Sequence, residues 1–167
     1  TGLAYSEDAY DVEVLWEGED PDDTILVGAG AFSSTSAWIY NHGLFFFDAT
    51  GTPADFGTNG VVEASLVSGS DRAYGLAIDR GPTSANADDM IITTGVAGGQ
   101  FAIARFDANG DLDTGFDIDG ESGTDDYVVN LGVGSTGMGV SILPSGQIVA
   151  AGYAPVAGVN DFALVAL

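Results

Sequence analysis

The sequence predicts an all-β protein built from a repeat of about 60 residues. Three short apolar segments end in glycine at nearly even spacing, and each is followed by a second apolar or aromatic segment. No stretch shows a sustained 3.6-residue periodicity, and the 25 glycines suit a chain with many tight turns. The glycine-ended segments are LVGAG at 26–30, IITTG at 91–95 and IVAAG at 148–152.

One strand is expected before each glycine-ended segment. These strands are DVEVL near Val12, AYGLAI near Leu76 and GVSIL near Val140. A tight turn is expected at 144–146 in the third pair, because proline fixes its own φ and glycine tolerates the backbone conformations that a tight turn needs. A similar turn is expected at 21–23 in the first pair. The middle pair has a longer polar connection at 79–89, which is typical of a surface insertion.

A further strand is expected after each glycine-ended segment and a variable loop. These strands are WIYNHGLFFFD ending at Asp48, FAIARFD ending at Asp107, and FALVAL from Phe162 to the terminus. The first two lead into similar turn segments, DATGTPADFGTNG and DANGDLDTGFDIDG. Alanines alternate with larger residues in 101–106, which favours stacked sheets. We therefore expect a single repeat module over 1–167, with approximate units 9–60, 61–120 and 121–167.

The motifs resemble the delta-sixty repeat family of bacterial, mostly secreted or surface-attached proteins. The resemblance rests on FAIARFDANGDLDTGF at 101–116, followed by GVSILPSGQIVAAGYAPVAGVNDFALVAL at 139–167. Ser145 and Gln147 replace the usual Asp and Lys, and Asp117 follows Phe116 where Gly is expected. The resemblance implies a β-propeller-like arrangement of antiparallel four-stranded blades, and it implies no characterised catalytic activity.

A chain of this length holds fewer than three such blades, whereas propellers typically close with four to eight. The strand expected at 162–167 is apolar and has no following partner in the sequence, and an unpaired apolar edge promotes aggregation. We therefore expect it to pair with the N-terminal segment or with another copy of the protein. Heterologous pairing between copies would give a ring or a filament.

The composition restricts the class of partner and the location. Twenty-five acidic residues against three basic ones give a formal charge of -22 at pH 7. Such a surface repels phosphate, which argues against nucleic acid and anionic membranes as partners. No apolar run approaches the roughly 20 residues that cross a bilayer, so membrane insertion is not expected. High external salt or bound divalent cations would make this charge tolerable, and both indicate an extracellular or cell-surface protein.

The termini and the cysteine count add two further expectations. Because the chain begins with Thr1, we expect a processed or excised product. The absence of cysteine excludes a disulfide scaffold and a thiolate metal site.

The densest acidic stretch, 107–126, is the candidate metal site. Calcium takes six to eight oxygen ligands, and Asp-x-Asp spacing in a glycine-containing loop can turn several carboxylates toward one point. The favoured alternative is a turn between strands with solvated acids, because no full EF-hand register is present. The corresponding stretch of the first repeat unit has only Asp48, Asp55 and Asn59 as possible ligands, which argues against a calcium site in every repeat. The candidate calcium ligands are Asp107, Asn109, Asp111, Asp113, Asp117, Asp119 and Glu121.

Catalytic residues are not evident from the sequence. His42 is the only histidine, so a Ser-His-Asp triad or histidine metal cluster would have to include it, and a structural or interfacial role is expected instead. The acidic run at 17–23 is expected to be a solvated loop. One aromatic group is expected to lie in the core or at an interface, with sugar stacking as the alternative, and comprises Trp38, Tyr40, Phe45, Phe46 and Phe47.

These observations favour a non-catalytic extracellular structural or interaction module, whose blades dock against partner chains or other copies. Two alternatives remain open. One is a calcium-dependent adhesive or carbohydrate-binding module that uses 107–126. The other is a polysaccharide-processing enzyme with two carboxylates across a cleft, for which the sequence favours no particular pair.

Overall fold

The computed structural model describes residues 7–16, 25–32, 40–81, 89–118 and 127–167. Over these residues the chain forms ten strands and no helix, so the all-β prediction is confirmed. It follows that no helix of the described residues could cross a membrane. The strands are β1 (Glu7–Trp16), β2 (Ile25–Phe32), β3 (Asn41–Asp48), β4 (Val61–Ala64), β5 (Arg72–Asp79), β6 (Met90–Ala97), β7 (Gln100–Asp107), β8 (Thr136–Ile142), β9 (Ile148–Val156) and β10 (Val159–Ala166).

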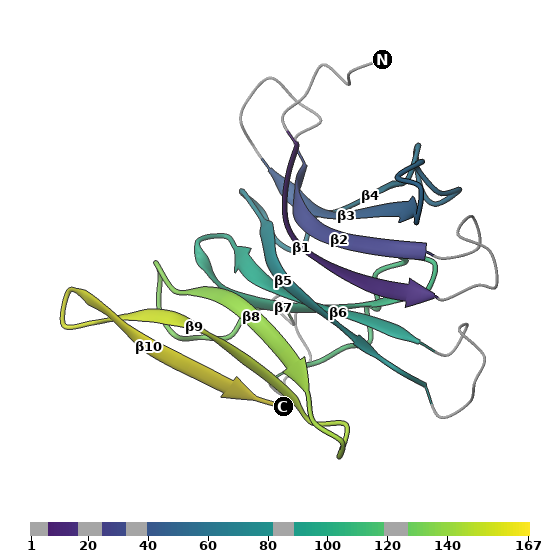
Figure 1. The fold of residues 1–167 in the computed structure, drawn as a ribbon. Coiled ribbons are helices and arrows are strands. Elements are labelled where there is room, and N and C mark those ends of the chain that lie inside the picture. The colour runs from purple at the N-terminus through teal and green to yellow at the C-terminus, as the bar shows by residue number, and fades with distance from the viewer. Residues whose placement is uncertain (1–6, 17–24, 33–39, 82–88, 119–126) are drawn as a thin grey trace.

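The strands form three antiparallel sheets in which neighbours in the sequence are neighbours in space (Figure 1). The first sheet has the order β1-β2-β3-β4, the second β5-β6-β7 and the third β8-β9-β10. Two connections are tighter than the variable loops expected from the sequence. Gly98 and Gly99 join β6 to β7, and Ala157 and Gly158 join β9 to β10, all with positive φ. Such two-residue turns match the twist of a hairpin.

The fourth strand position is filled to a different extent in each sheet. In the first sheet, β4 pairs with β3. In the second, Val128 forms a single bridge to Ala102, with the Ile103 N–H donating to the Tyr127 carbonyl at 2.9 Å and the Val129 N–H donating to the Phe101 carbonyl at 2.8 Å. In the third sheet, within the described ranges, β10 pairs with β9 alone. The expected pairing of this strand with the N-terminal segment is not found there, because β1 belongs to the first sheet and the second sheet lies between it and the third. Residues 1–6 lie outside the described ranges.

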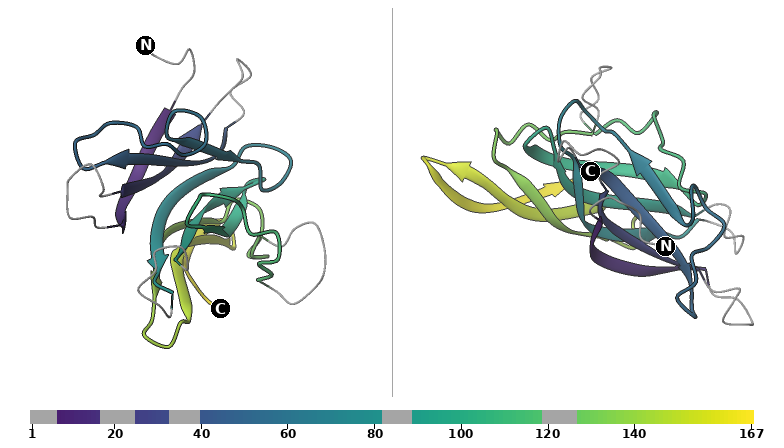
Figure 2. Two further views of the ribbon diagram at one scale, coloured as in Figure 1. Left: turned by 90° about the vertical axis from the view of Figure 1, so that its right-hand side faces the viewer. Right: turned by 90° about the horizontal axis from the view of Figure 1, so that it is seen from above.

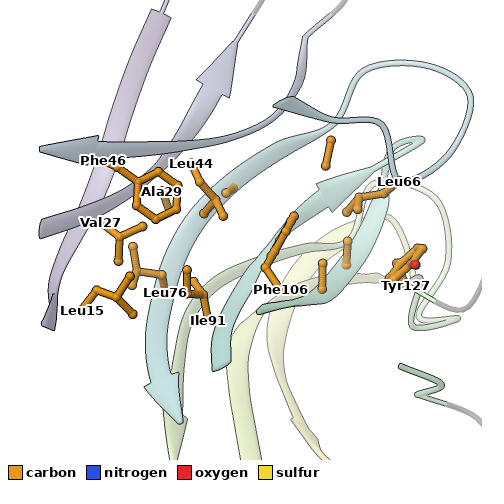
Figure 3. Packing of buried hydrophobic residues seen from close by; sticks show 14 of the residues in the cluster. Leu15, Val27, Ala29, Leu44, Phe46, Leu66, Leu76, Ile91, Phe106 and Tyr127 are labelled. Atoms are coloured by element: carbon orange, nitrogen blue, oxygen red, sulfur yellow. The ribbon is translucent and has the colours of Figure 1, made fainter. Parts of the chain in front are cut away.

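The sheets stack face to face, with the second sheet between the other two (Figures 1 and 2). Side chains of the first sheet meet those of the second in one apolar cluster, in which Val27 and Leu44 face Leu76, Ile91 and Phe106 (Figure 3). A second cluster fills the next contact and includes Phe101, Ile103, Ile148, Ala150 and Ala163. Each contact therefore buries one face of each adjoining sheet, as in stacked β-sheet architectures.

All three sheets share a bulge in their first hairpin. This bulge explains why a glycine recurs at the end of the apolar segments at 26–30, 91–95 and 148–152, and we call it the repeat glycine. The register slips by one residue between Ala9 and Asp11, between Ala73 and Gly75, and between Gly137 and Gly139. The repeat glycine lies opposite the bulge in each case. A Cβ atom there would overlap a backbone carbonyl oxygen, that of Asp8 at Gly30, of Arg72 at Gly95 and of Thr136 at Gly152. A bulge brings the neighbouring backbone closer, and only glycine leaves room for it.

Candidate functional site

The acidic segment that begins at Asp107 forms a turn at the end of β7. The Asp107 carboxylate accepts hydrogen bonds from the backbone N–H groups of Asn109 and Asp111, both at 2.9 Å. Its other oxygen accepts one from the side-chain amide of Asn109 at 3.2 Å. Gly110 completes the turn with a φ of 85°. These bonds are those of an Asx turn, in which the aspartate side chain holds its own backbone.

The first sheet carries the same turn at Asp48. Its Oδ1 accepts hydrogen bonds from the backbone N–H groups of Thr50 at 2.9 Å and Thr52 at 2.8 Å, and from the Thr50 hydroxyl at 2.6 Å. These bonds, that of the Thr50 hydroxyl foremost, hold the pKa of the Asp48 carboxyl below its usual value. Two sheets thus use an aspartate in one local role, which favours the turn interpretation of Asp107.

Asp113 is paired with a cation of the same sheet. Its Oδ2 lies 2.6 Å from Nη2 and 2.8 Å from Nε of Arg105, and its Oδ1 accepts the Gly115 N–H at 2.9 Å. Partial burial raises the pKa of Asp113, but the hydrogen bonds from Arg105 and Gly115 outweigh it and the net shift is downward. The Arg105 guanidinium also lies 4.6 Å from the centre of the Phe116 ring. Asp113 therefore belongs to a local ion pair.

The structure brings only part of the candidate calcium set together. Asp107, Asn109 and Asp111 share one turn, Asp113 faces Arg105, and Asp117 is exposed. Asp119 and Glu121 lie outside the described residues. In the ranges that the structure describes, no group of three or more His, Cys, Asp and Glu side chains could hold a metal ion. A calcium site in 107–126 stays a prediction.

His42 lies in the contact between the first and second sheets. Its side chain is buried, its Nε2 lies 2.8 Å from the Thr93 hydroxyl, and its ring stacks on Phe106 with centroids 6.1 Å apart. Burial lowers the pKa of His42 to about 3, so the ring is neutral at physiological pH. The position between sheets is the one expected of a structural residue.

The aromatic group of the first sheet is largely internal. Tyr40, Phe45 and Phe46 are buried and Phe47 is half-buried, while Trp38 and the acidic run at 17–23 lie outside the described residues. Phe46 stacks on Phe56 with centroids 4.4 Å apart. The buried rings agree with the expected core role.

Each of two shallow depressions on the described surface has a single carboxylate in its lining. One lies beside β5 and the β8–β9 turn and includes Asp79, and the other lies beside β2 and the Asp48 turn and includes Asp55. Neither presents the facing pair of carboxylates that glycoside hydrolysis requires. A polysaccharide-processing activity therefore stays a prediction.

The register of the sheets defines equivalent positions on their faces. The repeat glycine pairs with Gly43 in the first sheet, Ala102 in the second and Ala163 in the third. Side chains alternate along a strand, so the residues directly before and after Gly43, Ala102 and Ala163 point to the other face of the sheet than these three residues do. We call this the trailing face, since in the first two sheets it packs against the sheet that follows. Its equivalent residues on the third strand of each sheet are His42, Phe101 and Phe162, and Leu44, Ile103 and Leu164.

The trailing face of the third sheet is uncovered. His42, Leu44, Phe101 and Ile103 are buried in the contacts between sheets. Their equivalents in the third sheet are 72% exposed at Phe162 and 60% exposed at Leu164. Apolar side chains thus occupy positions that the following sheet buries twice within this chain, and here nothing among the described residues buries them. Exposed apolar patches of this kind mark interaction surfaces. The trailing face of the third sheet is the candidate functional site.

The sequence predicts an open apolar strand at 162–167, with the opening at its edge. The structure shows that the face is open as well. Aligning the strand FAIARFD at 101–107 with FALVAL at 162–167 places Phe162 level with Phe101, and this similarity is the signal that the sequence offers.

Comparison with known proteins agrees with the repeat architecture. Residues 87–116, which include β6, β7 and the Asp107 turn, match the family described as "Domain of unknown function (DUF5122) beta-propeller". The chain contains a β-propeller-type repeat. Its three stacked antiparallel sheets form a partial, propeller-like fold in which no sheet is closed. No curated protein and no solved structure matches the chain significantly.

Proposed function

We propose that this propeller-type chain is a non-catalytic structural and interaction module, extracellular or on the cell surface, which docks the trailing face of its third sheet against another protein. The observation that carries the proposal is the exposure of Phe162 and Leu164, whose equivalents in the other sheets are buried. Burying a large apolar side chain contributes roughly 1.5–3 kcal/mol, so two such residues are enough to form the centre of an interface.

The chemistry of the face agrees with this role. Its residues in the central part of β9 and β10 are uncharged, and each of them is exposed or half-buried; they are Val149, Ala151, Tyr153, Phe162, Leu164 and Ala166. An interface core depleted of charge and containing aromatic side chains is typical of protein partners. The net charge of -22 supports the proposed extracellular location, because salt or divalent cations screen the repulsion there. We further place the chain with the delta-sixty repeats, on the motifs at 101–116 and 139–167.

Binding of the neutral dye Nile red tests whether the face is an accessible surface. A negatively charged dye would be repelled by this protein, so a neutral probe is preferable. At low protein concentration and low salt, where copies stay apart, we expect the wild-type chain to bind the dye and the double variant F162D/L164D to bind clearly less of it with an unchanged Tm. The matched control is Val133→Asp, at a 78% exposed apolar residue outside the face, which should keep the dye signal.

Two results would contradict the proposal. If the double variant unfolds or its Tm falls by many degrees, the two side chains belong to the core of the folded chain. If dye binding survives the double substitution and is lost in V133D, the accessible apolar surface lies elsewhere.

A further inference from the structure

We infer that the partner on the trailing face of the third sheet is the first strand, β1, of a second copy of this chain, an inference that rests on the proposed function. The two contacts between sheets within the chain follow one pattern. β5 lies against β1 and β2, and β8 lies against β5 and β6. In both cases the first strand of a sheet covers the trailing face of the sheet before it.

The shared bulge identifies the residues that do the covering. Side chains that point toward the preceding sheet form what we call the leading face. On β5 these are Ala73, Leu76 and Ile78, and on β8 they are Gly137, Val140 and Ile142. Counting from the bulge, the equivalent residues on β1 are Ala9, Val12 and Val14. β1 therefore presents the same small and aliphatic residues that cover a trailing face elsewhere.

Nothing in the described part of the chain covers the leading face of β1, as is also the case for the trailing face of the third sheet. Leu76 is 3% exposed in its contact with the first sheet, whereas its equivalent Val12 is 62% exposed. The chain thus has two open surfaces, and each has the character of one side of a contact that the chain makes twice internally. A contact between two copies would extend the same stacking. It would bury Val12 of one copy and Phe162 and Leu164 of the other.

The internal contacts also specify the register between the copies. A Cβ at Gly137 would overlap the Thr94 hydroxyl, so the β8 backbone is seated directly on Thr94. In the preceding contact the equivalent residues are Ala73 and Ala29, which are fully buried in one cluster. The same equivalence places Ala9 of one copy on Ala151 of the other. Small residues at both positions permit the close approach that the internal contacts show.

The two surfaces differ from each other, so the association is head-to-tail. A heterologous contact of this kind produces either a closed ring or an open filament. Neither surface carries a charge among the residues named, while each copy bears a net charge of -22. Salt screens this long-range repulsion, and association should therefore strengthen as ionic strength rises.

Disulfide trapping tests the register, and it is clean because the natural chain has no cysteine. Chains carrying Ala9→Cys and chains carrying Ala151→Cys are mixed in high salt under mild oxidation, with tags of different length. We expect the mixed disulfide dimer to form at least about tenfold faster than in the control, because docking holds the two thiols at a high effective concentration. The control pairs A9C with Ser145→Cys, in an exposed turn away from the face. Adding F162D to the A151C chain should remove the difference.

Equal rates for A9C with A151C and A9C with S145C would overturn the inference, as would a single-chain mass at every concentration and salt tested. In either case Nile red binding that F162D/L164D abolishes would still support the docking face with a different partner. If the A9C–A151C pair shows no preference and the double substitution F162D/L164D also leaves Nile red binding unchanged, the proposed function is contradicted as well.

Discussion

A single glycine makes room for the bulge in the first hairpin of each sheet. Gly30, Gly95 and Gly152 lie opposite the bulges, where the backbone carbonyl of the neighbouring strand occupies the space of a Cβ. The repeated glycine is therefore a steric requirement of the repeat. The sequence predicts these glycines as strand ends, which is wrong, because β2, β6 and β9 continue past them to Phe32, Ala97 and Val156. Local sequence cannot show the reason for the glycines, because the clash is with a residue of the preceding strand.

Alanine substitution at Gly95 should test this directly. Gly95→Ala forces the Cβ into the Arg72 carbonyl, and we expect a loss of about 3 kcal/mol or more in the free energy of unfolding. The matched control is Gly139→Ala in the bulge of the third sheet, where the Cβ would meet open space. Denaturant unfolding monitored by circular dichroism measures both. Equal stability of the two variants would refute the steric explanation.

His42 makes the contact between the first two sheets sensitive to pH. The folded chain holds its pKa at about 3 against an ordinary value of 6.5, because burial disfavours the charged ring. Between these values the unfolded chain binds a proton that the folded chain does not. The contribution of neutral His42 to the free energy of unfolding is therefore fully present above pH 6.5. It is lost as the pH falls below that value, by about 1.4 kcal/mol per pH unit.

The variant His42→Phe should remove this dependence. Phenylalanine is the residue at the equivalent position of the other two sheets, in Phe101 and Phe162, so the packing is compatible with the fold. We expect the free energy of unfolding of wild type to fall more steeply than that of H42F from pH 6.5 to 5. Both chains contain the same carboxyl groups, including Asp71, whose pKa burial raises, so the difference between the two profiles isolates His42. Parallel pH profiles would show that His42 does not carry the effect.

At the scale of the elements, the sequence predicted nine of the strands near their observed positions, because each is an apolar run bounded by turn residues. The strand it missed, β4, has only four residues, and it is defined by pairing with β3. Local pattern cannot reveal such a strand. The calcium candidates show the same limit, since Asp-x-Asp spacing is common to a metal loop and to an Asx turn. The hydrogen bonds of Asp107 favour the turn, and the calcium site stays a prediction.

Removing the Asp107 side chain separates the two interpretations. If Asp107 holds the turn, Asp107→Ala should cost about 1–2 kcal/mol, because its carboxylate accepts backbone N–H groups, and calcium should change the Tm of neither chain. Asp111→Ala, at an exposed carboxylate of the same turn, is the control and should cost little. A rise in wild-type Tm with calcium that both variants lose would support the calcium hypothesis instead. Thermal unfolding with calcium or chelator provides the measurement.

At the scale of the whole molecule, the described residues form a stack of three sheets, in which one type of interface occurs twice and the outer faces of β1 and of the third sheet are open. The internal contacts bury His42, Leu44, Phe101 and Ile103, while the end residues Phe162 and Leu164 stay in solvent. Stacked units that contact only their neighbours gain stability from each added interface. The open ends therefore favour continued stacking, and the high negative charge opposes it at low salt.

Light scattering on two complementary variants tests this account most directly. F162D spoils the trailing face of the third sheet and keeps the leading face of β1, and Val12→Asp does the reverse. Each variant alone should have the mass of one chain, 16.9 kDa, while wild type grows larger with concentration and salt. An equimolar mixture should form a dimer and no larger species, because each dimer retains only spoiled surfaces. A mixture that stays monomeric while both variants remain folded would contradict the head-to-tail stacking of this repeat.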